Sequence, residues 1–339
     1  VVSVSSTSLD NTYEVGSVIP ITIAFNENVI VTGTPQLELS TGDNTCLSFD
    51  GIDDYVDVGT VTTNFSSGLS VSAWVFYNSF NSWSRIIDFD VAIDAGQHNG
   101  ILLANSDTTN SLTFEVYVDG TSGGKVTASD ALFTGVWTYL VASMDSAGNV
   151  ILYKDGVPIH SGTTSVPAVM DRPSSFIGRS NYSWDGYFDG SIDEVSFWDR
   201  ALTQNEIQNS MFTGFSGDED GLQGYWKFDT GADTIAYDHS GNANHGDING
   251  ASWAVSLTYV PDDNFEQALI DLGYDDVLDN YVVTDSINSV TVLPVSSSSI
   301  SDLTGIEDFI ALESLNCSYN QLTSLDLSND APMTGYLLC

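Results

Sequence analysis

The spacing of short strand-like runs between residues 45 and 257 most constrains how this chain can fold. Apolar runs recur at close intervals, for example GLSVSAWVFY (68–77), SLTFEVYV (111–118) and WTYLVASM (137–144). Asp-Gly, Gly-Asn and Ser-Gly turns separate such runs, and no long helical pattern interrupts them. This arrangement is typical of an antiparallel sandwich or jelly roll.

Two local elements can be placed within this region from their turn and capping residues. YKDGVPI (153–159) predicts a β-hairpin with its Asp-Gly pair at the turn. TQNEIQNSM predicts one short helix at 203–211, where Thr203 is the N-cap and Glu206 completes a capping box.

Acidic residues dominate the charge of the chain. There are 46 Asp and Glu against 7 Lys and Arg, which gives a formal net charge of −39. Such a polyanion is repelled by nucleic acid and by anionic membranes, so we expect neither as a partner. The charge suits contact with divalent cations, and it equally suits solvation of a secreted protein in salty water. A hydrophobic fraction of 42% and an aromatic content of 11% indicate packed cores rather than disorder.

The composition also indicates export, because it is rich in Ser, Thr, Gly, Asn and Asp and poor in Lys. No stretch approaches the ~18 apolar residues of a transmembrane segment, and no signal-peptide pattern opens the chain. We expect a mature or truncated piece of a larger extracellular protein. Cys46, Cys317 and Cys339 are too few and too scattered to predict a disulfide framework or a zinc site.

Residues 45–257 carry five motifs in a fixed order. They are FDGIDDYVDV, LSVSAWV, WTYLVASMDSAGNVILYKDGVPI, SFIGRSNYSWDGYFDGSIDEVSFWDRALTQNEI and GYWKFDTGADTIAYDHSGNANHGDINGASW. Together they resemble a laminin-G-like domain of the concanavalin A-like lectin/glucanase superfamily, in its pentraxin-related bacterial form. The resemblance implies a mainly β protein built on an antiparallel jelly-roll β-sandwich of the concanavalin A-like kind.

Residues 1–44 carry shorter alternating runs, in which Ile19, Ile21, Ile23 and Phe25 are separated by smaller or polar residues. A period of two predicts half-buried strands, here about four, which is fewer than a stable sandwich needs. VGSVIPITIAFNENVIVTGTPQLELSTG resembles the immunoglobulin- or cadherin-like repeats of bacterial surface adhesins. We therefore expect a partial Ig/cadherin-like repeat before the sandwich.

Residues 258–339 change character and begin with a helical pattern. PDDNFEQALIDLG predicts a helix with Asp263 as N-cap, Glu266 three residues on and Gly273 as its end. We expect this helix to cap the segment that follows.

A leucine-rich pattern follows this helix. Its positions fit L-x-x-L-x-C-x-x-N-x-L and continue to a further leucine: Leu312, Leu315, Cys317, Asn320, Leu322 and Leu325. In such repeats Asn320 is expected to bond the turn backbone inside a solenoid. The segment resembles the helix-capped leucine-rich repeats of secreted Bacteroidetes-type proteins, truncated after two or three repeats. Cys317 is then a buried small hydrophobe, and Cys339 has no assigned role.

The sequence does not predict an enzyme. Glucanase relatives of the concanavalin A-like fold carry an E-x-D-x-x-E pattern on one strand, whose acids serve as nucleophile and acid. SIDEVSFWD offers only adjacent Asp193 and Glu194, which strand alternation directs to opposite faces. The four histidines lie in polar, Gly- or Asn-rich contexts, and no G-x-S-x-G elbow is present.

One candidate metal site lies in LSFDGIDDYVDVG. Four acids occur there among apolar residues: Asp50, Asp53, Asp54 and Asp57. Calcium takes six to eight oxygen ligands, and the resemblance implies one structural Ca²⁺ at the rim of the sandwich, shared by Asp50 and Asp193. The alternative is that Asp50 and Asp53 cap the turn at Gly51 as Asx residues. We expect Asp54 and Asp57 to be solvated.

Pentraxins hold a second, ligand-type calcium, and here its counterpart would lie beside FIGRSNYSWDG. Arg179 in that loop disfavours a cation, whereas Asp88, Asp90 and Asp94 nearby favour one. The sequence leaves this second ion open.

Aromatic residues beside amides and acids form the candidate ligand site. Sugar rings present apolar faces on which Trp and Tyr stack, and neighbouring Asn and Asp can bond their hydroxyls. The candidates are Trp83, Asn181, Tyr182, Trp184 and Asp185. The alternative is that these rings plug one end of the sandwich.

Together these features predict a secreted, non-enzymatic binding or adhesion protein of the bacterial cell surface. Its partner is expected to be a glycan or an extracellular protein. Two other interpretations remain: the accessory carbohydrate-binding region of a polysaccharide-degrading enzyme, or a structural spacer in a cell-surface stalk.

Overall fold

The chain divides into two compact units, residues 1–40 and residues 41–339. The computed structural model describes residues 3–6, 21–24, 45–62, 64–94, 98–231, 234–323, 325 and 335–339. None of the helices within these residues is long and apolar enough to cross a membrane.

The first unit contains one antiparallel strand pair, β1 (Ser3–Ser6) with β2 (Ile21–Ala24). Ile21 and Ile23 of the alternating pattern lie in β2. The rest of that pattern lies outside the described residues, and the Ig/cadherin-like repeat stays a prediction.

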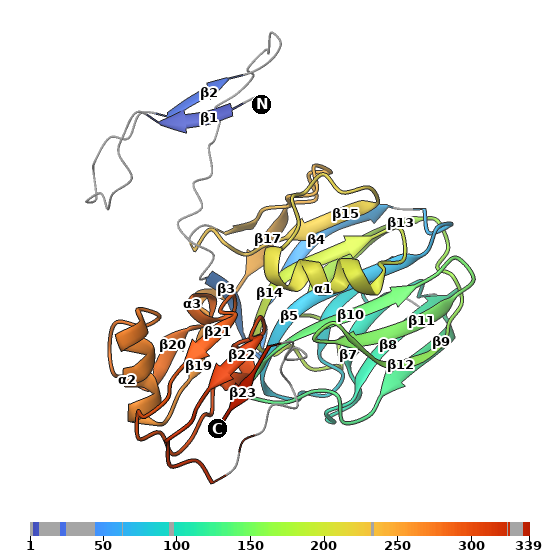
Figure 1. The fold of residues 1–339 in the computed structure, drawn as a ribbon. Coiled ribbons are helices and arrows are strands. Elements are labelled where there is room, and N and C mark those ends of the chain that lie inside the picture. The colour runs from blue at the N-terminus through green and yellow to red at the C-terminus, as the bar shows by residue number, and fades with distance from the viewer. Residues whose placement is uncertain are drawn as a thin grey trace. The chain divides into compact units, whose positions relative to one another are not determined.

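The second unit is built around two eight-stranded sheets (Figure 1). The first sheet has the order β12-β11-β10-β5-β14-β3-β18, with β15 paired to β14. Its strands are β3 (Thr45–Asp50), β5 (Leu69–Ser79), β10 (Trp137–Met144), β11 (Asn149–Lys154), β12 (Val157–Thr163), β14 (Asp189–Trp198), β15 (Leu222–Trp226) and β18 (Ser252–Val255).

The second sheet has the order β16-β17-β4-β13-β6-β7-β8-β9. Its strands are β4 (Tyr55–Thr62), β6 (Arg85–Asp90), β7 (Ile101–Asn105), β8 (Leu112–Val118), β9 (Thr121–Ala128), β13 (Asp171–Ile177), β16 (Ile235–Ala236) and β17 (Gly246–Asn249). Every strand pairing in the two sheets is antiparallel, which confirms the predicted antiparallel sandwich.

The main core lies between the two sheets because alternate residues of each strand point inward. On β8 the inward residues are fully buried: Leu112, Phe114 and Val116. Each such side chain contributes about 1.5–3 kcal/mol by leaving water. The intervening residues, among them Glu115 and Tyr117, therefore face the outer side of the second sheet, where the candidate ligand site lies.

Two local predictions in the sandwich are confirmed. In the hairpin of β11 and β12, Asp155 and Gly156 form the turn with positive φ of 48° and 72°. Helix α1 (Gln204–Thr213) has Thr203 as N-cap and a complete capping box with Glu206. Its Ile207 packs in a smaller apolar cluster with aromatic side chains of the first sheet, so α1 covers the outer face of that sheet (Figure 1).

The C-terminal segment begins one residue after β18. Here β19 (Leu257–Tyr259) pairs with β20 (Tyr281–Val283), and β21 (Val292–Pro294), β22 (Ser314–Asn316) and β23 (Leu337–Leu338) form a parallel sheet. The helical elements are α2 (Asp263–Leu272), α3 (Thr284–Ile287) and the 3₁₀ helix η1 (Ile306–Asp308).

The cap of α2 was predicted one residue too late. Asp262, not Asp263, is the N-cap and accepts hydrogen bonds from the backbone N–H of Asn264 and Phe265. Glu266 does not close a capping box. It is buried, and its Oε1 accepts the N–H groups of Asp279 and Asn280 before β20 and of Tyr281, the first residue of β20. The predicted end at Gly273 is confirmed, with the left-handed φ of 83° that favours glycine.

The predicted role of Asn320 is confirmed. Its Oδ1 accepts the N–H groups of Ser298 and Ile300, and its Nδ2 donates to the carbonyls of Val295 and Cys317. One side chain thus bonds the backbone of two successive turns of the parallel stack.

The prediction for the cysteines was wrong. Cys317 is buried as expected, but it forms a disulfide with Cys339. Sequence spacing does not reveal this pair, because the parallel strands β22 and β23 bring together residues one repeat apart. Cys46 is buried in the sandwich as a thiol, and its Sγ donates to the carbonyl of Ala254 (3.5 Å).

Candidate functional site

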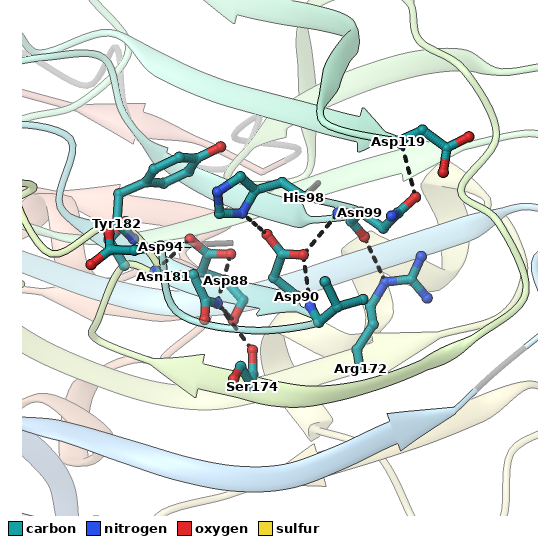
Figure 2. A network of polar contacts seen from close by, with 12 residues as sticks. Asp88, Asp90, Asp94, His98, Asn99, Asp119, Arg172, Ser174, Asn181 and Tyr182 are labelled. Atoms are coloured by element: carbon teal, nitrogen blue, oxygen red, sulfur yellow. Dashed lines mark hydrogen bonds and ion pairs between the residues drawn. The ribbon is translucent and has the colours of Figure 1, made fainter. Parts of the chain in front are cut away.

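The candidate ligand site lies on the outer face of the second sheet, where two connections meet the end of β6. One runs from β6 to β7 and carries His98; the other runs from β13 to β14 and carries Asn181 and Tyr182 (Figure 2). We call the following residues the loop site: Asp88, Asp90, His98, Tyr117, Asn181, Tyr182 and Trp184.

Two buried acids of β6 form its floor. Phe89 points into the core, so Asp88 and Asp90 on either side of it point outward, yet each is 1% exposed. The Asp88 carboxylate accepts from Arg85 Nε (3.2 Å), and the Asp90 carboxylate contacts His98 Nδ1 (2.6 Å). Burial raises the pKa of the Asp88 carboxyl, and the positive charge of Arg85 opposes that rise.

These contacts argue against a second, ligand-type calcium at Asp88 and Asp90. Asp90 also accepts the backbone N–H of Val91 (2.7 Å) and Asn99 (2.8 Å). The two carboxylates are therefore satisfied by donors from the protein, whereas calcium needs free carboxylate oxygens.

Asn181, predicted to touch the ligand, instead anchors the loop. It is fully buried, and its backbone N–H and Nδ2 both donate to the Asp88 carboxylate, at 3.0 and 3.1 Å. Nδ2 also donates to the carbonyl of Ser174 on β13 (3.0 Å), as Figure 2 shows. The next turn is fixed by Asp94, which accepts the N–H of Ser183 (2.9 Å). That hydrogen bond is the main reason why the pKa of Asp94 is lowered.

Asp185 is likewise engaged within the protein. Its Oδ2 accepts from Arg85 Nη2 (2.7 Å) and from Ser180 Oγ (2.8 Å). Arg85 Nη1 also donates to the carbonyl of Trp83 (2.5 Å). A single buried guanidinium thus ties together β6, the Trp83 turn and the Asp185 loop.

The aromatic rings form a graded stack from buried to exposed. The ring of Tyr182 lies 4.2 Å from that of His98, tilted by 32°, and 6.1 Å from that of Tyr117. Trp184 lies 5.2 Å from Tyr182 and is 71% exposed. Trp184 therefore does not plug the sandwich, because most of its surface faces solvent.

Trp83 lies beside this stack in a different setting. It is half-buried, and the Lys125 ammonium (5.0 Å) and the Arg85 guanidinium (5.9 Å) lie near its ring centroid. Its backbone adopts a left-handed φ of 52°. Trp83, Tyr182 and Trp184 were predicted from the sequence as site residues, whereas Arg85 and His98 were not. The strand SRIIDFD could have indicated them: its apolar residues predict burial, and two buried aspartates need hydrogen-bond or ion-pair partners.

The structure does not bring together the two residues of the predicted calcium site. Strand β3 pairs with β14 so that Asp50 lies opposite Asp189 and Leu47 opposite Ile192. Asp193 is four residues beyond Asp189, which is about 13 Å along a strand. A single calcium ion shared by Asp50 and Asp193 does not fit this register.

Asp50 instead clusters with two other acids of its own turn. Ligand oxygens of Asp50, Asp53 and Asp54 lie within 4.8 Å of one another. Asp50 Oδ1 accepts the N–H of Ile52 (2.8 Å), and Asp54 Oδ2 accepts the N–H of Asp50 (2.8 Å). The Asx interpretation is thus correct for Asp50, and the Asx role of Asp53 stays a prediction. Both residues are exposed. Asp54 is buried, not solvated as predicted, and this burial raises the pKa of its carboxyl.

Asp193 and Glu194 lie at an irregularity of β14, where its register with β5 shifts. Glu194 has a left-handed φ of 50°, and its Oε2 accepts the hydroxyl of Tyr225. The hydroxyl of this buried tyrosine thereby contacts Glu194 within the smaller apolar cluster that α1 covers on the outer face of the first sheet.

The class of fold follows from these sheets and from a family comparison. Residues 50–208 match the Laminin_G_3 model, described as the concanavalin A-like lectin/glucanases superfamily. The protein is mainly β, and its antiparallel sandwich is a concanavalin A-like jelly roll.

The solved structures to which this chain is similar are distant in sequence. A candidate carbohydrate-binding protein from Bacteroides ovatus is 19% identical with a TM-score of 0.50, over 62% of this chain and 60% of that one. The CBM40 of the Ruminococcus gnavus IT-sialidase, solved with α2,3 sialyllactose, is 11% identical with a TM-score of 0.41, over 49% and 97%. Domains LG4-5 of the mouse laminin α1 chain are 16% identical with a TM-score of 0.35, over 47% and 44%.

One curated relative matches a short stretch. Internalin J of Listeria monocytogenes serotype 4b (strain F2365) is 36% identical over 72 residues, which is 21% of this chain and 8% of that protein. The chain thus spans a small part of this relative's length.

Proposed function

We propose that the sandwich binds glycans at the loop site, with Trp184 as the platform for a sugar ring, in a secreted, non-enzymatic protein of the bacterial cell surface. The observation that carries this proposal is the exposed indole of Trp184, 71% accessible and backed by Tyr182. An exposed tryptophan gains by covering its face with the apolar side of a sugar. The disulfide between Cys317 and Cys339 supports an oxidising, extracellular compartment.

The loop that carries Trp184 is held in one conformation before any ligand binds, which supports a binding role for this residue. Tyr182 stacks on His98, and His98 is held by the buried Asp90. Asn181, bonded to Asp88, fixes the loop from below. A rigid site loses little conformational entropy when a ligand binds.

The test is Trp184→Ala on a broad glycan array, with Tyr319→Ala as the matched control. Tyr319 is 88% exposed and belongs to the C-terminal segment, so its removal deletes an exposed ring elsewhere. We expect Trp184→Ala to lose glycan retention while its melting temperature stays nearly unchanged, and Tyr319→Ala to bind like the wild type. Wild-type protein that retains no glycan would indicate a spacer or a protein-binding module instead.

We also propose that Asp50, Asp53 and Asp54 hold a structural calcium ion. Three carboxylates converge there, and a hard cation with oxygen ligands would neutralise their mutual repulsion. Calcium would supply charge neutralisation and rigidity to this turn.

A further inference from the structure

Most of the few cationic side chains of this protein are engaged internally. Ion pairs join Arg85 to Asp88 and Asp185, Arg200 to Glu206, and Lys227 to Asp229. Arg172 is fully buried and donates to backbone carbonyls. Three cations form no hydrogen bond or ion pair with any residue that the structure describes, and each lies over an aromatic ring: Lys125, Lys154 and Arg179. Of these, Arg179 is the one that carries a guanidinium and lies in a connection of the loop site. In a chain with 46 acidic residues, such a cation stands out.

Arg179 is held by aromatic rings instead. Its guanidinium carbon lies 4.7 Å from the ring centroid of Tyr55 and 4.7 Å from that of Phe176. These two rings pack edge to face at 5.6 Å. Contacts with ring faces leave N–H groups at the edge of a guanidinium able to bond a ligand.

This cation lies on the same face as the loop site. Tyr55 on β4 and Phe176 on β13 precede Val56 and Ile177, which point into the core, so both rings face outward from the second sheet. Strand β13 adjoins β6, which carries the floor of the loop site.

Arg179 also belongs to the connection that forms the loop site, three residues before Tyr182. One acidic side chain beside that connection is Asp94, whose pKa is lowered in small part by Arg179. Asp94 nevertheless accepts the N–H of Ser183 and makes no ion pair with Arg179. The guanidinium is therefore fixed in place without an internal anion.

We propose that Arg179 binds the anionic group of an acidic sugar, a carboxylate or a sulfate ester, within a glycan that Trp184 also contacts. This inference rests on the proposed function and narrows it to acidic glycans. The planar fork of a guanidinium matches the two oxygens of a carboxylate or sulfate in bidentate geometry. Because the net charge of −39 repels polyanions at long range, recognition has to rely on such a local contact.

The experiment compares wild type, Arg179→Gln, Arg179→Lys and the control Lys154→Gln on an array of carboxylated, sulfated and neutral glycans. Lys154 is the matched control because it is also a cation held over a ring, that of Phe133, but on the first sheet. Titration calorimetry at about 150 mM salt, which screens the long-range repulsion, then measures the best acidic glycan and its neutral counterpart. The counterpart is the methyl ester of a carboxylated glycan or the desulfated form of a sulfated one, which separates the two sources of charge.

We expect Arg179→Gln to weaken the acidic glycan by about tenfold, in line with the loss of a charge-assisted hydrogen bond, and to leave the neutral counterpart unchanged. Arg179→Lys should fall between them, because it keeps the charge but loses the planar fork, and Lys154→Gln should match the wild type. Unchanged melting temperatures verify that the variants fold. The role of Arg179 is overturned if Arg179→Gln weakens binding of the acidic and neutral forms equally, or if the wild type retains neutral glycans alone. The proposed function stands in both cases. Retention of no glycan at all overturns both.

Discussion

Replacement of Arg85 by methionine tests whether the loop site is held together by a buried charge network. Arg85 is 3% exposed and donates to the carboxylates of Asp88 and Asp185 and to the carbonyl of Trp83. Methionine fills much of the same volume but cannot donate, so the 1% exposed Asp88 loses its neutralising charge.

The expected cost of Arg85→Met is about 3–5 kcal/mol in the free energy of unfolding near pH 8, because an uncompensated charge stays buried. Asp88 retains the two donors of Asn181, which places the loss toward the lower end of that range. The second partner, Asp185, is 8% exposed and keeps the hydrogen bond from Ser180 Oγ.

The pH dependence has a definite sign. Burial already raises the pKa of Asp88 above that of an ordinary carboxyl, and Arg85 opposes this rise. In the variant the folded-state pKa rises further, so the folded state binds a proton more tightly than the unfolded state. The protonated carboxyl therefore favours folding below the ordinary value of about 3.9, and this contribution is lost as pH rises through the raised pKa. The destabilisation by Arg85→Met should be smaller at about pH 4 than at pH 8.

Urea unfolding at both pH values measures these differences, and Asp88→Asn supplies the partner for a double-mutant cycle. Arg85→Met should cost clearly less in the Asp88→Asn background, since residue 88 then carries no charge that Arg85 has to neutralise. A cost below about 1 kcal/mol at pH 8, the range of an exposed ion pair, or the same cost in both backgrounds, would refute the network.

Two further predictions concern other parts of the molecule. Cys339→Ser should lower the stability of the C-terminal segment by about 3 kcal/mol, because the disulfide with Cys317 closes a 22-residue separation. Cys46→Ser is the thiol control. A reductant should lower the stability of the wild type by a similar amount and leave that of Cys339→Ser unchanged. Calcium at millimolar concentration should raise the melting temperature, with about 2.7 kcal/mol gained at a hundred times the dissociation constant, and EDTA should reverse it. Asp53→Asn should weaken this response and Asp57→Asn should not; an unshifted melting temperature in calcium argues against the ion.

Sequence patterns predicted the elements whose signals are local. The period of two in the strands, the Asp-Gly turn of the β11–β12 hairpin and the capping box of Thr203 each depend on neighbours along the chain. Asn320 was also predictable, because a leucine-rich pattern places its amide inside successive turns.

The predictions were wrong where contacts with residues distant in sequence decide which of several similar residues takes a role. Asp262 and Asp263 are chemically identical candidates for the cap of α2. Asp262 was selected because its other oxygen accepts from Ser301 and Asp302, far along the chain. An N-cap side chain that also bonds a distant segment gains stability from those hydrogen bonds, and the local sequence of the helix does not reveal them.

Register decided the metal site in the same way. Asp50 and Asp193 lie on β3 and β14, which are paired. The register of this antiparallel pair fixes which residues face each other, and it places Asp189, not Asp193, opposite Asp50. The acids that do cluster with Asp50 are its own neighbours, Asp53 and Asp54.

The sequence by itself determined that this protein forms a β-sandwich, because alternation and turn residues act over a few positions. It also predicted a ligand site in the aromatic loop, with packing of the same rings as the alternative. The tertiary structure alone decided that Trp184 is open while Asn181 and Asp185 are engaged, and that Arg179 remains without an anion. The physical reason is that burial and pairing of polar groups depend on which strands and loops meet: Asn181 finds Asp88 93 positions away and Asp185 finds Arg85 100 positions away.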